Sequence, residues 1–105
     1  MKKARNKYYA LQCFDAPVFV CVDGRPARIK GYHEFEFFYY RDRLEAYFIV
    51  EATTGLAVGS YSYLLSDKRK DAKLILDRAG KEKLTKCIRE SIEKNGLSPR
   101  YVEAS

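Results

Sequence analysis

The stretch LEAYFIVEATTGLAVGSYSYLLSDKRKDAKLILDRAG, residues 44–80, decides the fold class of this chain. Residues 44–51 are the clearest strand pattern in the sequence, and Thr53-Thr54-Gly55 predicts a tight hairpin from which residues 56–65 return. The pattern changes at Ser66, a good helix N-cap residue, where a helical period begins. The stretch therefore predicts a strand hairpin that is followed directly by a helix.

The helical pattern divides at Gly80. Apolar positions before and after it lie on two faces that differ by more than a quarter turn, at about 100° per residue. These positions are Ala72, Ile75, Leu76 and Ala79, and then Leu84, Cys87, Ile88 and Ile92. One straight helix cannot bury both stripes, so we expect two helices or one helix kinked at Gly80. Asn95 and Gly96, with Pro99 beyond them, predict where the helical region ends.

Upstream of residue 44 the sequence predicts further antiparallel strands. Asp23-Gly24 is a strong hairpin signal, because glycine accepts the positive φ of a type I′ turn. Gly31 predicts a bulge or bend, because one strand from Arg25 to Tyr40 would exceed the usual strand length. The strands expected in this half cover residues 8–14, 18–22, 25–30 and 32–40.

Together these elements predict an α+β domain. We expect an antiparallel β-meander of five to six strands, followed by two C-terminal helices, or one kinked helix, packed on one face. The length of 105 residues fits a single domain. Its expected parts are a basic flexible arm over residues 1–7, the sheet over 8–65, a helical region over 66–96 and a tail over 97–105.

The composition is that of an ordinary globular protein. Lys and Arg number 20 against 14 Asp and Glu, for a formal charge of +6, and 47% of the residues are hydrophobic, which excludes a disordered or low-complexity chain. No apolar run reaches the roughly 18 residues of a membrane helix, and we expect no targeting segment. Cys13, Cys21 and Cys87 have no short-range pairing, which predicts reduced thiols, buried as small core residues, in a cytoplasmic protein.

The sequence contains no recognisable catalytic or metal-binding motif. Its glycines are isolated, so no phosphate-binding loop is present. His33 is the single histidine, and the neighbouring Glu34 and Glu36 have the opposite strand parity, so it lacks the partners of a general base. One histidine and three scattered cysteines do not form the closely spaced ligand pairs of a zinc site. We therefore expect a non-enzymatic protein without metal or cofactor.

Basic residues beside aromatic ones predict the first candidate function, a small binding module for nucleic acid or a phosphate-bearing nucleotide. Cationic side chains neutralise phosphates, and aromatic rings stack on bases. The basic N-terminal arm and the predicted strand around Arg28 supply both kinds of group. The candidate binding residues are Lys2, Lys3, Arg5, Lys7, Arg25, Arg28, Lys30 and Tyr32.

Aromatic residues predict a second surface and an alternative function. In the predicted strand over residues 34–40, aromatic residues occupy alternate positions of both kinds, so they point to both faces of the sheet. A sheet that is packed on one face only cannot bury both groups of rings. Exposed aromatic surface beside charge marks an interface. We therefore expect a homo-oligomer, a dimer, formed through Phe38, Tyr40, Tyr61 and Tyr63. The alternative function is a protein-binding accessory or inhibitor module, of the kind that phages and mobile elements direct at host defence machinery.

Overall fold

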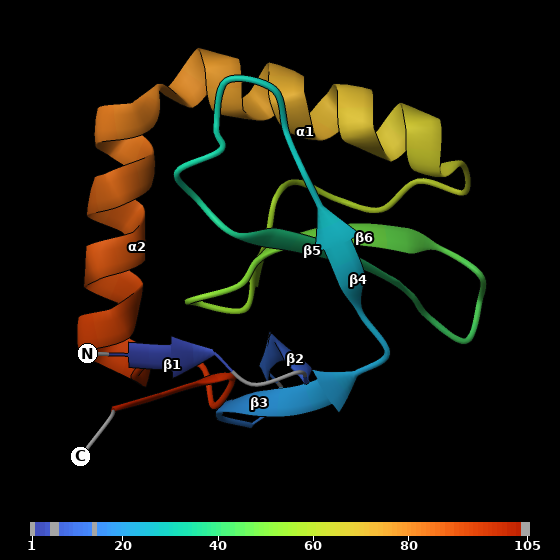
Figure 1. Ribbon diagram of the computed structural model, residues 1–105. Helices are drawn as coiled ribbons and strands as arrows, with labels where there is room; N and C mark the ends of the chain where they lie inside the picture. Colours follow the sequence, from blue (N-terminus) through green and yellow to red (C-terminus); the bar gives the residue numbers. More distant parts are fainter. Residues whose placement is uncertain (1, 5–6, 14, 104–105) are drawn as a thin grey trace.

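The chain folds into three layers, with a four-stranded sheet between a helix and a β-hairpin (Figure 1). The computed structural model describes residues 2–4, 7–13 and 15–103. Its elements are β1 (Lys2–Ala4), β2 (Tyr8–Cys13), β3 (Pro17–Val22), β4 (Arg25–Ala27), β5 (Phe37–Arg41), β6 (Tyr47–Glu51), β7 (Leu56–Ala57), α1 (Leu65–Ala79), α2 (Lys81–Asn95) and β8 (Tyr101–Glu103). The strand pairs described are antiparallel and two helices follow β7, so the predicted α+β class is confirmed.

The main sheet has the strand order β4-β5-β6-β7 and is apolar on both faces. Because side chains alternate along a strand, Phe37 and Ile49 point to one face and Phe38 and Val50 to the other. The first pair shares a buried cluster with Ala72 and Leu76 of α1. The second pair shares a separate cluster with side chains of the β2–β3 hairpin. Each face of the sheet is therefore covered by its own layer.

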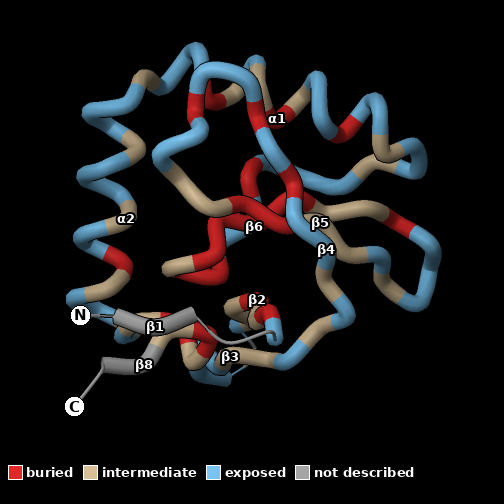
Figure 2. The backbone as a smooth tube through the Cα atoms, viewed as in Figure 1, coloured by how far each residue is buried: buried red, intermediate tan, exposed pale blue. Residues whose placement is uncertain are grey.

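The β2–β3 hairpin explains why aromatic residues occur on both parities of β5. The rings of Tyr8 and Phe38 lie 4.7 Å apart, centroid to centroid, and Phe38 is 0% exposed. Figure 2 shows the buried residues gathered in β5 and β6, between α1 and this hairpin. The β2–β3 hairpin of the same chain therefore buries Phe38, one of the aromatic residues that predicted a dimer.

The hairpin predicted at Asp23-Gly24 is wrong. β3 pairs with β2, through a connection over residues 14–16, whereas β4 pairs with β5 in the other sheet. Gly24 has no positive φ, and a Cβ built on it would lie 2.9 Å from both Phe38 Cδ2 and Tyr8 Cβ. Glycine is needed here because the backbone between β3 and β4 lies against the side chains of Tyr8 and Phe38. The local sequence does not reveal this contact.

Four predicted strands are shorter than expected, namely those over residues 25–30, 32–40, 44–51 and 56–65. β4 ends at Ala27, and residues 28–36 form a loop with two turns, closed by hydrogen bonds from Tyr32 N to Ile29 O and from Phe35 N to Tyr32 O. The return strand predicted over 56–65 is paired only at β7, and the chain meets β6 again at a single bridge between Ser62 and Tyr47. The loop over 28–36 leaves space beside β4 that a continuous strand would have filled.

The helical region consists of two helices that meet at Gly80, as the change of apolar face predicted. Gly80 has a φ of 84° and joins them, and its N–H donates to Leu76 O. α1 begins at Leu65 after an extended Leu64 that forms no side-chain cap, so Ser66 lies within the first turn and is not the N-cap. No described helix is long and apolar enough to span a bilayer.

The two ends of the chain lie side by side. β1 pairs with β8, in the register Lys2 to Glu103 and Ala4 to Tyr101. Residues 2–4 and 101–103, which belong to the predicted arm and tail, are therefore strands.

The cysteines differ from their predicted role as core residues, because Cys13, Cys21 and Cys87 are all exposed. Cys13 lies opposite Pro17 and Cys21 lies opposite Tyr9, so the two cysteines of the hairpin are four positions apart along the ladder. At about 3.4 Å per residue this separation exceeds the reach of a disulfide.

Candidate functional site

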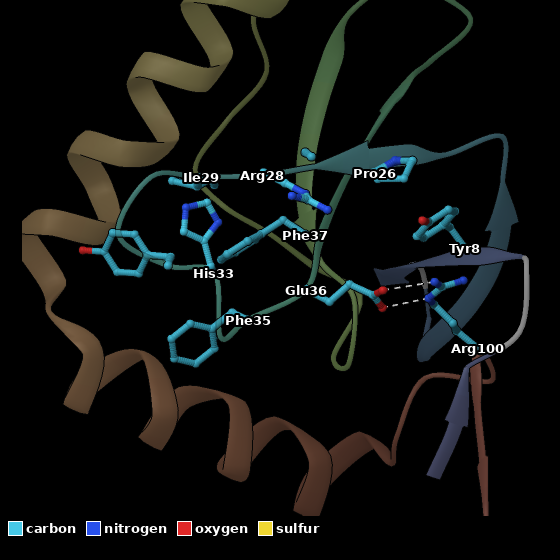
Figure 3. A pocket seen from close by; sticks show the side chains of 11 residues that line it. Tyr8, Pro26, Arg28, Ile29, His33, Phe35, Glu36, Phe37 and Arg100 are labelled. Carbon is cyan, nitrogen blue, oxygen red and sulfur yellow. Dashed lines mark hydrogen bonds and ion pairs between the residues drawn. The ribbon is translucent and has the colours of Figure 1, made fainter.

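A cavity of about 580 Å³ opens between β4, the loop over 28–36 and the C-terminal segment (Figure 3). Its volume falls within the range of about 300–1,000 Å³ that is usual for small-molecule sites. The residues that line it are Tyr8, Pro26, Ala27, Arg28, Ile29, Tyr32, His33, Phe35, Glu36, Phe37 and Arg100. They come from regions as far apart in sequence as β2 and the segment before β8.

The loop over 28–36 supplies two exposed basic side chains, Arg28 and His33, to the cavity. Its two turns place them near the apolar residues Ile29 and Phe37, which are 4% and 2% exposed. In the close-up, His33 and the ion pair of Glu36 with Arg100 lie on opposite sides of the cavity, and Arg28 lies between them (Figure 3). The cavity thus combines hydrogen-bond donors at its rim with an apolar wall.

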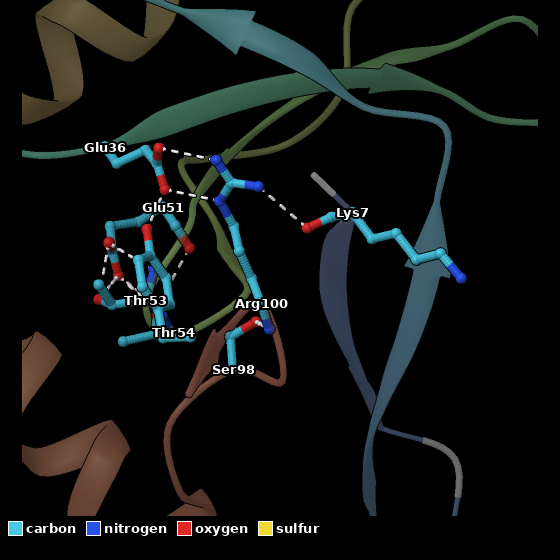
Figure 4. A network of polar contacts seen from close by, with 8 residues as sticks. Lys7, Glu36, Glu51, Thr53, Thr54, Ser98 and Arg100 are labelled. Atoms are coloured by element: carbon cyan, nitrogen blue, oxygen red, sulfur yellow. Dashed lines mark hydrogen bonds and ion pairs between the residues drawn. The ribbon is translucent and has the colours of Figure 1, made fainter. Parts of the chain in front are cut away.

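The opposite side of the cavity is formed by Arg100 and Glu36, which form an ion pair with two hydrogen bonds. Arg100 Nε donates to Glu36 Oε1 over 2.8 Å, and its Nη2 donates to Oε2 over 3.0 Å. The third nitrogen, Nη1, donates to Lys7 O over 3.1 Å (Figure 4). The guanidinium carbon lies 4.1 Å from the centroid of Tyr8. The Tyr101 hydroxyl also donates to Glu36. This network fixes the C-terminal segment against β2 and the sheet.

The network shifts two pKa values in opposite directions. Hydrogen bonding by Arg100, with a further bond from Tyr101, holds the pKa of the Glu36 carboxyl below its ordinary value, although partial burial opposes this. Burial, followed by the bond to Glu36, raises the pKa of the Tyr101 hydroxyl. Glu36 is therefore an anion at neutral pH while Tyr101 keeps its proton.

The lowered pKa of Glu36 predicts a loss of stability in acid. A carboxyl whose pKa is lower in the folded protein stabilises it above the unfolded value of about 4.3 and loses this contribution as pH falls through the folded value. Urea unfolding of wild type and Glu36→Gln should therefore differ more at pH 7 than at pH 3. Parallel pH profiles for the two proteins would contradict this role for the pair.

The structure brings together only part of the predicted phosphate-binding set. Arg28 and Tyr32 line the cavity, and Lys7 contributes its carbonyl to the Arg100 network. Arg25 and Lys30 are exposed but do not line it. Lys2 and Lys3 belong to β1, where they pair with β8, and Arg5 lies outside the described residues.

Tyr32 does not present the free ring face that stacking on a base requires. It is only 6% exposed, and its hydroxyl donates to Asp77 Oδ1 of α1 over 2.8 Å. The ammonium nitrogens of Lys73 and Lys81 each lie 5.7 Å from the centroid of its ring. Tyr32 therefore ties the loop over 28–36 to the helices, and the stacking role predicted for it is not available in this arrangement.

The four residues of the predicted interface fall into two groups. Phe38 is completely buried, so it cannot take part in a surface contact. Tyr61 and Tyr63 are 51% and 61% exposed, and their ring centroids lie 5.5 Å apart. The half-buried Tyr40 connects to Tyr61 through Phe48, with centroid distances of 5.3 and 6.1 Å. We call Tyr40, Phe48, Tyr61 and Tyr63 the tyrosine surface.

Sequence reasoning missed His33, Glu36 and Arg100 as members of one site. Glu36 and Arg100 are 64 positions apart, and neither stands in a motif that indicates a pair. His33 had been assigned to a strand, where it would have faced away from Glu36. The available sequence signal was Gly31, because glycine readily adopts the positive φ of a turn. In the structure Gly31 has a φ of 90° and lies in the loop that interrupts the predicted strands.

Among the described residues, no three His, Cys, Asp or Glu side chains gather as a metal-binding group. The chain matches no family model, no curated protein and no solved structure.

Proposed function

We propose that this protein is a non-enzymatic binding module and that its cavity binds a phosphate-bearing nucleotide. The observation that supports the proposal is the arrangement of Arg28 and His33 on one cavity with an apolar wall. Arginine presents several donors in a fixed geometry that suits a phosphate, and a histidine can add another donor.

The walls of the cavity suit the remainder of a nucleotide. Phe35 is half-buried and stands beside Phe37, at a centroid distance of 6.4 Å, so the lining offers aromatic and apolar surface to a base. At the far side, the oxygens of Glu36 are hydrogen-bonded to Arg100 and Tyr101, which makes the carboxylate a fixed polar wall. A ligand with one anionic and one flat apolar part therefore fits better than a simple ion.

Calorimetry with the four nucleoside 5′-monophosphates, the matching nucleosides and inorganic phosphate tests the proposal. We expect a nucleotide to bind and its nucleoside to bind about 10- to 100-fold more weakly, because a charged hydrogen bond contributes about 1.5–3 kcal/mol. Arg28→Ala should weaken nucleotide binding by a similar factor and leave nucleoside binding unchanged.

Arg43→Ala is the control for that experiment. Arg43 is an exposed arginine in the turn between β5 and β6, beyond the end of β5 opposite to Phe37 and the cavity. This substitution removes the same charge and should leave the affinity unaltered. Equal losses in both variants, or no heat with any of the nucleotides, would rule out the cavity as a nucleotide site.

Protein binding is the second candidate function, and the tyrosine surface favours it. Two tyrosines with more than half of their surface exposed lie beside one another, and tyrosine is enriched in protein interfaces. The partner is another protein, such as a component of host defence machinery, or a second copy of the chain. Sedimentation of wild type and of a Tyr61→Ser, Tyr63→Ser variant separates a dimer from the 12.2 kDa monomer. The cytoplasmic location stays a prediction.

A further inference from the structure

A second group of aromatic and basic side chains lies at the other end of the sheet, on the face that packs against α1. It consists of Arg25, Tyr39, Arg41, Tyr47 and Arg69, which we call the arginine–tyrosine surface. The three arginines are exposed and the two tyrosines are half-buried. None of these residues lines the cavity.

Strand register brings the group together. Arg25 of β4 lies directly opposite Tyr39 of β5, and Arg41 lies directly opposite Tyr47 of β6. Directly opposite residues point to the same face of a sheet, and so do residues two apart on one strand. α1 adds Arg69 from above this face, with its guanidinium carbon 5.9 Å from the centroid of Tyr39. All five side chains therefore belong to one continuous surface.

Two of the arginines, Arg41 and Arg69, lie close to the tyrosine rings. The centroids of Tyr39 and Tyr47 lie 6.3 Å apart, and the guanidinium carbon of Arg41 lies 5.3 Å from the centroid of Tyr47. A guanidinium within about 6 Å of a ring is attracted to its face. The arginines are thus held beside the rings.

The surface has an excess of positive charge. Arg41 forms an ion pair with Glu45 over 3.4 Å. Within the part of the chain that the structure describes, the side chains of Arg25 and Arg69 form no hydrogen bond and no ion pair. Asp42, which follows Arg41 in the chain, accepts backbone hydrogen bonds from Leu44 and Ala46 within its own turn. Two uncompensated cations therefore stand beside the two tyrosines.

We propose that the arginine–tyrosine surface binds single-stranded nucleic acid. Its arginines complement the charge of the phosphates. Tyr39 and Tyr47 are only half-buried, unlike the buried Tyr32, so they offer ring surface on which unpaired bases stack. A duplex presents its bases stacked on one another, so it cannot use the rings in this way. This inference concerns a different surface from the cavity and does not depend on nucleotide binding there.

Fluorescence anisotropy with labelled 12-nucleotide oligothymidine and oligouridine, at several salt concentrations, tests the inference. In Arg25→Ala, Arg69→Ala the slope of log affinity against log salt should fall by about 1.4, because each neutralised phosphate of a single strand contributes about 0.7. Tyr39→Ala should leave that slope nearly unchanged and weaken binding about 5- to 150-fold, because stacking contributes about 1–3 kcal/mol per base.

Two control variants separate this surface from unspecific attraction. Arg78→Ala, Arg89→Ala removes two exposed arginines from the helices, and it should leave the slope unchanged. Tyr9→Ala removes a half-buried ring from β2, outside both the cavity and the arginine–tyrosine surface, and should leave the affinity unchanged. The arginine variants alter exposed side chains only, so they remain informative even if Tyr39→Ala fails to fold.

The outcomes distinguish this inference from the proposed function. Oligonucleotide binding that persists in Arg28→Ala while mononucleotides fail to bind would support the arginine–tyrosine surface and reject the cavity. No binding of either oligonucleotide at low salt and tens of micromolar protein would overturn the inference. Equal slopes in the two double-arginine variants, or binding of a 12-base-pair duplex as tight as that of the single strands, would overturn it as well.

Discussion

Replacing Arg100 by leucine is expected to lower the free energy of unfolding by about 3 kcal/mol, the lower end of the range for breaking a buried ion pair. The side chain of Arg100 is only 9% exposed, whereas that of Glu36 is 38% exposed and can regain water, which limits the loss. The variant also removes the donor to Lys7 O and the guanidinium beside the Tyr8 ring. Urea unfolding followed by circular dichroism measures the change.

Two further variants separate the causes of that loss. Arg100→Lys keeps the charge but cannot form both bonds to Glu36, so it should lose part of the stability. Arg78→Leu removes an exposed arginine at the end of α1 and should alter the free energy of unfolding by less than about 0.5 kcal/mol. A loss below about 1 kcal/mol in Arg100→Leu would show that the C-terminal segment is held mainly by other contacts, such as the bond from Ser98 N to Thr53 O.

The sequence is sufficient to predict both helices and the approximate places of the strands from β2 to β7, but it does not predict β1 and β8 or how the strands combine into sheets. Helical periodicity located both helices and their junction at Gly80, because the apolar face changes there and the signal is local. The turn over Thr53-Thr54-Gly55 was likewise predicted, and it is stabilised by the buried carboxylate of Glu51, which accepts from the backbone and hydroxyl of both threonines. Strand pairing depends on distant partners, so the same kind of turn signal at Asp23-Gly24 gave the wrong hairpin.

The site was predictable only where its residues lie in one segment. Arg28 and Tyr32 were found because basic and aromatic residues stand close together there. Arg100 joins the cavity through its bond to a carboxylate 64 positions away, and no local pattern encodes that contact. Tyr39 lies in the aromatic stretch 34–40 that the sequence analysis identified, but its arginine neighbours Arg25 and Arg69 come from a different strand and a helix.

A substitution at Gly55 should disturb the fold as strongly as the loss of Arg100. Gly55 has a φ of 72°, and its carbonyl accepts a hydrogen bond from Leu11 N, 2.8 Å away, which joins the β2–β3 hairpin to the turn between β6 and β7. A Cβ at this position would lie 2.7 Å from that same nitrogen, a backbone atom that cannot move without shifting β2. The residue must therefore be glycine for both conformational and steric reasons.

We expect Gly55→Ala to lower the free energy of unfolding by about 3 kcal/mol, from roughly 1–2 kcal/mol for the left-handed backbone and a further 1–3 kcal/mol for overpacking. Gly31→Ala is the control, because Gly31 also has a positive φ, of 90°, but nothing lies within 4 Å of its Cβ position. It should lose only the backbone contribution. Because the hairpin covers Phe38, Gly55→Ala should also increase the binding of a hydrophobic dye before global unfolding. Equal losses in the two variants would show that the hairpin does not need this close contact with the turn.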